Sequence, residues 1–149
     1  MSPKALLRLA GAVLLALPLI PVQMVALRLG HGLAARLPVT FHRALIAILG
    51  VRVTESGRID DRRPLLVVAN HVSWLDIPVI GSRAHLSFIA KSEVNGWPVI
   101  GLFARLQRSV FIERARRHRT AAATSAIGAR LKAGDPMVLF GEGTTGDGM

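Results

Sequence analysis

The sequence predicts an α/β fold, with a mostly parallel sheet, flanking helices and an N-terminal membrane-associated helical segment. Beyond residue 41, short apolar runs typical of strands alternate with helical patterns. Residues 9–27 carry no charge. Hydrophobic residues make up 51% of the 149, which is more apolar surface than one small core can bury. We therefore expect a membrane anchor or re-entrant helical segment over residues 1–40 and one domain over residues 41–149.

The uncharged run from Leu9 to Leu27 has nearly the length of about 20 residues that a helix needs to cross a hydrocarbon core. Pro18 and Pro21 lie inside it, and each removes a backbone donor. A kinked, tilted or re-entrant segment is therefore as consistent with the sequence as a straight span. A secretory signal peptide and a buried core helix are the alternatives, although no small-x-small cleavage site follows the run.

The first elements of the domain follow from periodicity. Residues 41–49 have the spacing of a helix with one apolar face, which Gly50 ends. Residues 51–54 alternate as a strand, and the polar stretch 55–63 is typical of a turn or hairpin loop. The continuous apolar run over residues 65–69 predicts a strand covered on both faces.

The second half of the domain continues this alternation, and strands that alternate with helices imply a parallel sheet with crossover connections. The elements expected here are a turn into a short helix within 70–82, a strand at 85–90, a helix at 96–107, a strand at 110–112, a helix at 114–132 ended by Gly134, and a strand at 137–140. A Gly-rich turn follows the last strand at once and leaves it uncovered. We therefore expect the domain to be incomplete at the C-terminus.

Charge and cysteine content limit the function. Nineteen Lys and Arg against nine Asp and Glu give a net charge of +10, which favours anionic partners such as phospholipid headgroups, nucleic acid or a phosphorylated substrate. Residues 105–119 contain six arginines and one glutamate, a net charge of +5. This stretch could contact the membrane, bind CoA phosphates or an acidic carrier protein, or form a solvated helix face. Aromatic residues are only 5% and no nucleic-acid-binding motif occurs, so that class is excluded. The absence of cysteine excludes disulfides, thiolate zinc sites and cysteine nucleophiles.

His71 directly follows the predicted strand at 65–69, at the sheet edge where α/β proteins build their sites. Asp76 lies five residues further on, and five residues of an α-helix turn through about 500°, which leaves the two side chains about 140° apart. His71 must therefore lie in the turn before the helix if the two are to meet. Asp76 could then orient the imidazole, which would act as a base. Alternatively, His71 caps the helix and Asp76 is a solvated charge.

Three blocks of the sequence resemble those of the glycerolipid acyltransferase family, which includes the 1-acylglycerol-3-phosphate O-acyltransferases. Asn70, His71 and Asp76 are similar to its NHxxxxD catalytic block. Residues 110–114, Val-Phe-Ile-Glu-Arg, resemble its second block, and residues 140–144, Phe-Gly-Glu-Gly-Thr, resemble its third. The order and separations agree as well, and three ordered blocks are far more specific than one.

The resemblance implies transfer of a fatty acyl group from acyl-CoA or acyl carrier protein, as substrates rather than cofactors, to a lyso-lipid hydroxyl. It implies that His71 is the general base and that Asp76 orients it. It also assigns acceptor binding to four residues, Arg114, Glu142, Gly143 and Thr144. No cofactor and no metal are implied. Ser73 is the rival nucleophile, but no elbow motif surrounds it and we interpret it as structural.

Two departures from the family pattern bear on the acceptor. Gly141 replaces the usual proline, which loosens the turn before the third block. Thr145 stands where many members carry arginine, so a bidentate phosphate ligand is lost. Together with the GTTGDG-type third block and the Lys91-Ser92-Glu93 segment, these departures resemble the branch that acylates lyso-ornithine lipid, a phosphorus-free acceptor. The family's fourth block would lie beyond residue 149.

The resemblance places the chain at a membrane, on the cytoplasmic face of the bacterial inner membrane, with membrane lipids and the acyl donor as partners. The competing class is a non-catalytic membrane-surface lipid-binding protein, or an inactive acyltransferase fragment, in which His71 does no chemistry. The sequence carries no signal for oligomeric state.

Overall fold

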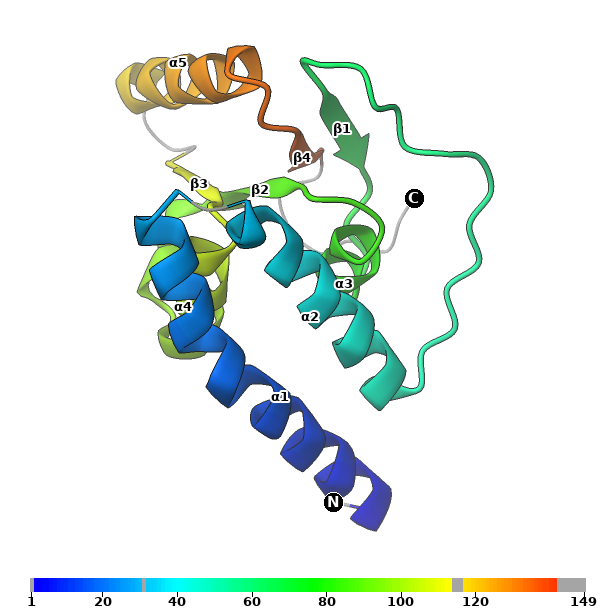
Figure 1. The fold of residues 1–149 in the computed structure, drawn as a ribbon. Coiled ribbons are helices and arrows are strands. Elements are labelled where there is room, and N and C mark those ends of the chain that lie inside the picture. Colours follow the sequence, from blue (N-terminus) through cyan, green and yellow to red (C-terminus); the bar gives the residue numbers. More distant parts are fainter. Residues whose placement is uncertain (1, 31, 114–116, 142–149) are drawn as a thin grey trace. The chain divides into compact units, whose positions relative to one another are not determined.

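The computed structural model describes residues 2–30, 32–113 and 117–141, with the backbone alone for residues 117–120. The chain forms two compact units (Figure 1). The hairpin unit comprises Met1–Ile59 and Leu75–His85, and the sheet unit comprises Asp60–Trp74 and Leu86–Met149. The predicted α/β class with an N-terminal apolar helix is confirmed.

The hairpin unit is built from helix α1 (Pro3–Arg28), helix α2 (Leu33–Leu49) and the short helix α3 (Asp76–Gly81). The first two helices pack against each other in opposite directions, because Gly11 near the start of α1 faces Ile48 near the end of α2. The predicted end at Gly50 is confirmed, since Gly50 adopts a left-handed conformation with φ +69°.

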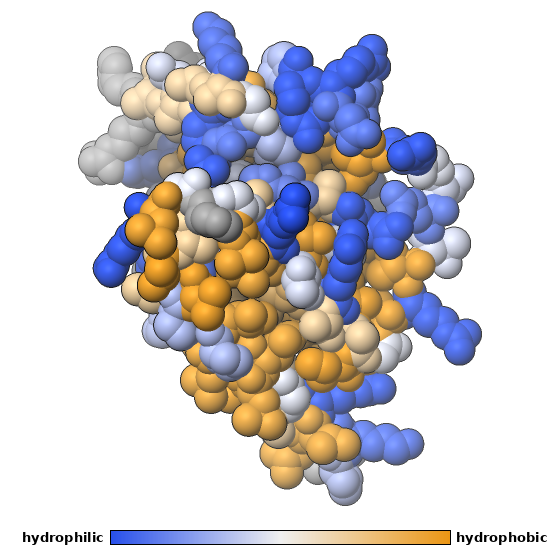
Figure 2. Space-filling view, in the orientation of Figure 1, coloured by the Kyte–Doolittle hydropathy of each residue, from blue (hydrophilic) through white to orange (hydrophobic). Residues whose placement is uncertain are grey.

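The apolar side chains of α1 are exposed along its length. Leu7, Leu14 and Leu17 are 74%, 70% and 62% exposed, and Figure 2 shows hydrophobic side chains gathered along this part of the molecule. Within the described chain, α1 is the one helix long and apolar enough to cross a membrane. It is not the buried core helix that the sequence left as an alternative. The helix continues through Pro18 and Pro21.

Helix α2 starts earlier than expected, at Leu33 instead of residue 41, so it runs across the predicted boundary at residue 40. Pro38 inside it has no N–H for the carbonyl of Ala34, four residues back. The side-chain amide of Gln23 on α1 donates to that carbonyl at 3.0 Å. Gln23 is 5% exposed in an otherwise apolar run. Its amide explains how the helix tolerates the proline, a pairing between helices that no local pattern could predict.

Replacement of Gln23 by leucine should destabilise the hairpin by about 1–3 kcal/mol, because the half-buried Ala34 carbonyl loses its donor. The loss should shrink in a Pro38→Ala background, where the residue 38 N–H can bond that carbonyl. Thermal melting followed by circular dichroism in detergent, for the unaltered protein, each single variant and the double variant, measures the coupling energy between residues 23 and 38. An equal loss in both backgrounds would contradict the assignment.

The sheet unit holds a four-stranded parallel sheet in the order β1-β4-β2-β3. Its strands are β1 (Leu66–Ala69), β2 (Ser87–Lys91), β3 (Val110–Ile112) and β4 (Met137–Phe140). The core lies at the central strands, where Leu86, directly before β2, and Met137 and Val138 of β4 are at most 2% exposed.

Helices complete the sheet unit. The 3-10 helix η1 (Ser92–Gly96) and helix α4 (Pro98–Leu106) join β2 to β3, and helix α5 (Arg117–Lys132) joins β3 to β4. Helices α4 and α5 lie on opposite faces of the sheet (Figure 1). Right-handed crossovers explain this arrangement, because the chain steps outward from β2 to β3 and then back to β4.

Two strand predictions are wrong. Residues 51–54 form no strand, although Val51 and Val53 are less exposed than their neighbours, because no ladder partner lies beside them among the described residues. The run at 65–69 is not covered on both faces, since Leu66 is 42% and Val68 66% exposed on β1. β1 is an edge strand here, and an apolar run alone cannot distinguish an edge from a centre.

A polar network holds the amino ends of the strands. Arg130 on α5 donates to Asp135 at 3.1 Å, to the Ser87 hydroxyl at 2.9 Å and to the carbonyl of Arg108. Ser87 opens β2 and is fully buried, and Arg108 also pairs with Asp135 at 3.0 Å. These hydrogen bonds and ion pairs hold the amino-end edge of the sheet, and the three sequence blocks reach the opposite, carboxyl edge.

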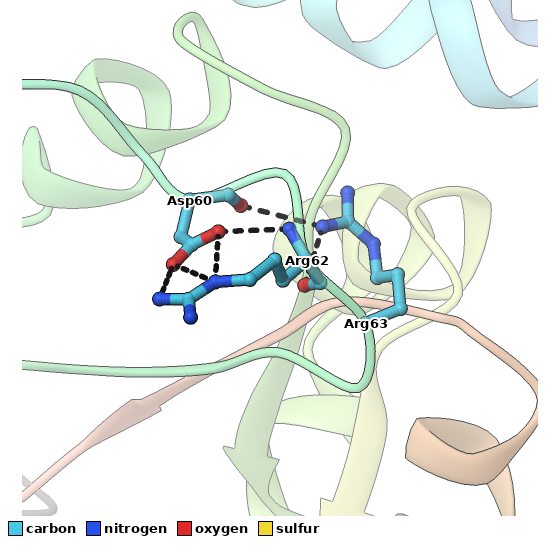
Figure 3. A network of polar contacts seen from close by, with 3 residues as sticks. All are labelled: Asp60, Arg62 and Arg63. Carbon is cyan, nitrogen blue, oxygen red and sulfur yellow. Dashed lines mark hydrogen bonds and ion pairs between the residues drawn. The ribbon is translucent and has the colours of Figure 1, made fainter.

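An exposed network lies in the loop before β1 (Figure 3). The Arg62 guanidinium donates to Asp60 Oδ2 at 2.8 and 2.5 Å, and the Arg62 backbone N–H donates to Oδ1 at 2.8 Å. These bonds hold the pKa of the Asp60 carboxyl below its usual value. The associated stabilisation is present above the unfolded-state pKa and is lost as the pH falls through the lowered value. It is small, because the pair is exposed.

Candidate functional site

The carboxyl ends of the parallel strands meet at one edge of the sheet, and each block of the sequence includes residues at this edge. Asn70 and His71 follow β1, Glu113 follows β3, and Gly141 follows β4. β1 and β4 are neighbours in register, with Ala69 opposite Phe140, and the Gly141 N–H donates to the Ala69 carbonyl at 3.2 Å. The first and third blocks therefore start side by side, where parallel α/β sheets bind ligands.

His71 lies in the turn between β1 and α3, as predicted. Its imidazole stacks on the ring of Phe140, with centroids 4.2 Å apart and an interplanar angle of 20°. Phe140 stacks in turn on Phe88 of β2, with centroids 5.9 Å apart. Both phenylalanines are buried, at 6% and 4% exposure. The imidazole therefore packs on the Phe140 ring, which in turn packs on the Phe88 ring.

Phe140 is a functional candidate that the sequence did not reveal as a partner of His71. The two residues are 69 positions apart, and only the pairing of β1 with β4 brings them together. The available signal was that Phe140 both ends a buried strand and opens the third block.

If His71 is the base that the resemblance implies, replacement of Phe140 by leucine should lower kcat by up to about tenfold with little change in KM, because an aromatic stack contributes about 0.5–1.5 kcal/mol to holding the imidazole. The matched control is Phe88→Leu, which removes a core ring that does not touch His71. Acyl-transfer kinetics and melting temperatures of both variants test this. Equal losses of kcat in the two variants would contradict the positioning role.

Asp76 is the first residue of α3 and belongs to the hairpin unit, whereas His71 belongs to the sheet unit. The helix begins five residues after His71, which confirms the expectation that His71 precedes the helix. The hydrogen bond between the two stays a prediction. Ser73 lies in the same turn as His71.

The remaining residues assigned by resemblance lie outside the described residues: Arg114, Glu142, Gly143 and Thr144. Lys91 ends β2 at the same edge as the three blocks. Among the described residues, no cluster of three or more His, Asp or Glu side chains could hold a metal ion.

The structure describes the side chains of two of the six clustered arginines, and both take part in contacts within the protein. Arg105 donates to the backbone carbonyl and the side-chain oxygen of Asn95 at 2.8 and 2.9 Å. Arg108 pairs with Asp135 at 3.0 Å. These two side chains therefore have a structural role, and Arg114 and Arg116 lie outside the described residues.

Comparison with known proteins identifies the family. The chain is 53% identical over 139 residues to a lyso-ornithine lipid O-acyltransferase of Brucella abortus (strain 2308), covering 93% of this chain and 52% of that protein. It is 49% identical to the protein of the same name from Rhizobium meliloti (strain 1021), covering 91% of this chain and 47% of the relative.

A 1-acyl-sn-glycerol-3-phosphate acyltransferase of Neisseria meningitidis serogroup B (strain ATCC BAA-335 / MC58) is 37% identical, over 72% of this chain and 42% of its own length. The chain thus spans about half the length of the curated relatives it matches. No solved structure matches it significantly. The family model described as Acyltransferase matches residues 50–148, which include all three blocks. The chain therefore belongs to the acyltransferase family.

Proposed function

We propose that the protein containing this chain is an O-acyltransferase that moves a fatty acyl group from acyl-CoA or acyl carrier protein to the free hydroxyl of lyso-ornithine lipid. The observation that carries the proposal is the position of His71, stacked on Phe140 where the first and third blocks begin at neighbouring strand ends. A titratable ring held at the carboxyl edge of a parallel sheet is suited to proton transfer.

The proposed reaction needs one base. A lipid hydroxyl is a poor nucleophile near neutral pH, so His71 takes its proton as the oxygen attacks the thioester carbonyl. The C–S bond then breaks, the new ester forms, and the thiolate leaves and is protonated from His71. Asp76 holds the imidazole in the tautomer with a free nitrogen. No covalent enzyme intermediate is required, because the acceptor attacks the donor directly.

The acceptor is proposed from two independent supports. Several relatives that match this chain carry the name lyso-ornithine lipid O-acyltransferase. Thr145 stands where many family members have an arginine, so the guanidinium suited to a phosphate is missing from that position. The 1-acyl-sn-glycerol-3-phosphate acyltransferases among the relatives make lysophosphatidate the competing acceptor.

The hairpin is proposed as the membrane anchor of the enzyme. Exposed leucines along α1 favour contact with lipid, and the net charge of +10 favours an anionic surface. We place the enzyme on the cytoplasmic face of the inner membrane. The lyso-lipid would then present its hydroxyl from the bilayer while the thioester arrives from water.

The test offers the full-length gene product each donor, acyl carrier protein or CoA thioester, with lyso-ornithine lipid or with lysophosphatidate. We expect acylation of lyso-ornithine lipid to dominate. A Thr145→Arg variant should increase the use of lysophosphatidate relative to lyso-ornithine lipid. Acylation of lysophosphatidate alone would refute the acceptor, and acylation of neither would refute the enzyme. Binding of lipid without turnover would favour a lipid-binding protein instead.

A further inference from the structure

We infer that His42 and Arg43 of α2 are positioning residues for Asp76, so that the apolar hairpin fixes the carboxylate of the HxxxxD pair as well as anchoring the protein. This inference rests on the roles proposed for His71 and Asp76. All the contacts that carry it lie within the hairpin unit.

Helix α3 cannot set its own orientation. It has six residues, far fewer than the roughly 12–15 that an isolated helix needs to be even marginally stable in water. Asp76 is its first residue, so the direction of the carboxylate follows the placement of the whole helix. That placement must come from neighbouring elements, and α2 lies against it (Figure 1).

The first contact is between His42 and Gly81. His42 is 6% exposed, and Gly81, the last residue of α3, is buried. A Cβ built at Gly81 would lie 2.5 Å from Cδ2 and 2.9 Å from Nε2 of the His42 ring. The imidazole therefore fills the space where any side chain at position 81 would lie. α3 can sit this close to α2 only because residue 81 is glycine.

The second contact caps the other side of this junction. Arg43 Nε donates to the Ser82 carbonyl at 2.8 Å, and Ser82, which follows α3, is 3% exposed. Without the guanidinium this carbonyl at the helix end would lose a donor in a place with little water. The Ser82 hydroxyl donates to the Val79 carbonyl at 2.7 Å and closes the same turn. An ion pair between Arg83 and Glu55 ties the chain beyond α3 to the chain beyond α2.

In this proposal, the two residues of the HxxxxD pair are held by different sets of contacts, one in each unit. Phe140 supports the imidazole in the sheet unit, whereas α2 holds the helix that begins with Asp76 in the hairpin unit. The return helix of the hairpin is thus part of the machinery that orients the base, although neither His42 nor Arg43 is assigned any contact with substrate.

The experiment measures kcat and KM of Arg43→Met, Arg43→Lys and Gly81→Ala in the full-length protein, each with and without Asp76→Asn. Arg43→Met keeps the apolar stem and removes the donor, and Gly81→Ala drives a methyl group into His42. Both should lower kcat by about ten- to a hundredfold with KM little changed, because small misplacements of a catalytic group cost this much. Arg43→Lys, which keeps a donor, should recover part of the loss. In the Asp76→Asn background Arg43→Met should have no further effect on kcat.

The matched control is Arg36→Met, the same change at another exposed position of α2, which should leave kcat unaltered. Unchanged kcat in both Arg43→Met and Gly81→Ala, or an equal loss with and without Asp76→Asn, would overturn the inference. Full turnover in Asp76→Asn itself would instead refute the proposed function, so the two failures are distinguishable. Melting temperature and membrane binding, measured for each variant, separate loss of orientation from loss of fold.

Discussion

Replacement of His71 by alanine is expected to lower kcat by about 10²–10⁴-fold, the range over which a positioned general base accelerates proton transfer. KM for the acyl donor should change little, because the role proposed for His71 is at the acceptor hydroxyl. The imidazole rests on Phe140 at the surface of the core and is only partly covered, so its removal leaves no large cavity. The measurement is transfer of a labelled acyl group by the full-length protein in lipid vesicles.

Two controls distinguish loss of the base from other causes of lost turnover. Ser73→Ala, two residues away in the same turn, should retain turnover if no covalent acyl-serine forms. Vesicle flotation of His71→Ala should match the unaltered protein, since α1 carries the exposed apolar surface. Retained turnover in His71→Ala would contradict the base assignment. A stable acyl adduct on Ser73 would show that Ser73 is the nucleophile.

Most of the sheet unit could be predicted because its strands and helix ends are marked by short segments of the sequence. The strands at 110–112 and 137–140 appear with the predicted bounds, and Gly134 adopts the left-handed conformation, φ +87°, expected of a residue that ends a helix. The parallel arrangement followed from strands alternating with helices, and it placed the three blocks at one edge. The position of His71 before the helix followed from helical geometry together with the hypothesis that His71 and Asp76 meet.

Contacts between distant segments could not be predicted in this way. The order β1-β4-β2-β3 makes β1 an edge strand and brings Phe140 under His71, and neither fact is encoded near either residue. The predicted helix starts only at residue 41, after Pro38, whose missing donor is a local signal, whereas the compensating amide of Gln23 lies on another helix. His42 and Arg43 belonged to an ordinary apolar helix in the sequence, and only their contacts with α3 give them a role.

Replacement of Leu14 by arginine is expected to weaken membrane binding about a hundredfold or more. Leu14 lies near the middle of α1 and is 70% exposed. Transfer scales place leucine at about −0.5 and arginine at about +2.5 to +3.5 kcal/mol per residue at a bilayer centre, so the change costs about 3–4 kcal/mol. Each 1.4 kcal/mol is about a factor of ten in partitioning. Flotation with vesicles of anionic lipid measures it, and an unchanged bound fraction would contradict a membrane role for α1.

Leu29→Arg distinguishes a span from a re-entrant hairpin. Leu29 follows α1 in the connection to α2, is 75% exposed and lies next to Arg28. If α1 crosses the bilayer, residue 29 is at an interface, and a second arginine there can reach the headgroups at little cost. If the hairpin enters one leaflet with its connection deepest, Leu29→Arg should cost more than Leu14→Arg. Because Arg28 and Arg36 already place positive charge near this connection, we expect Leu14→Arg to have the larger effect.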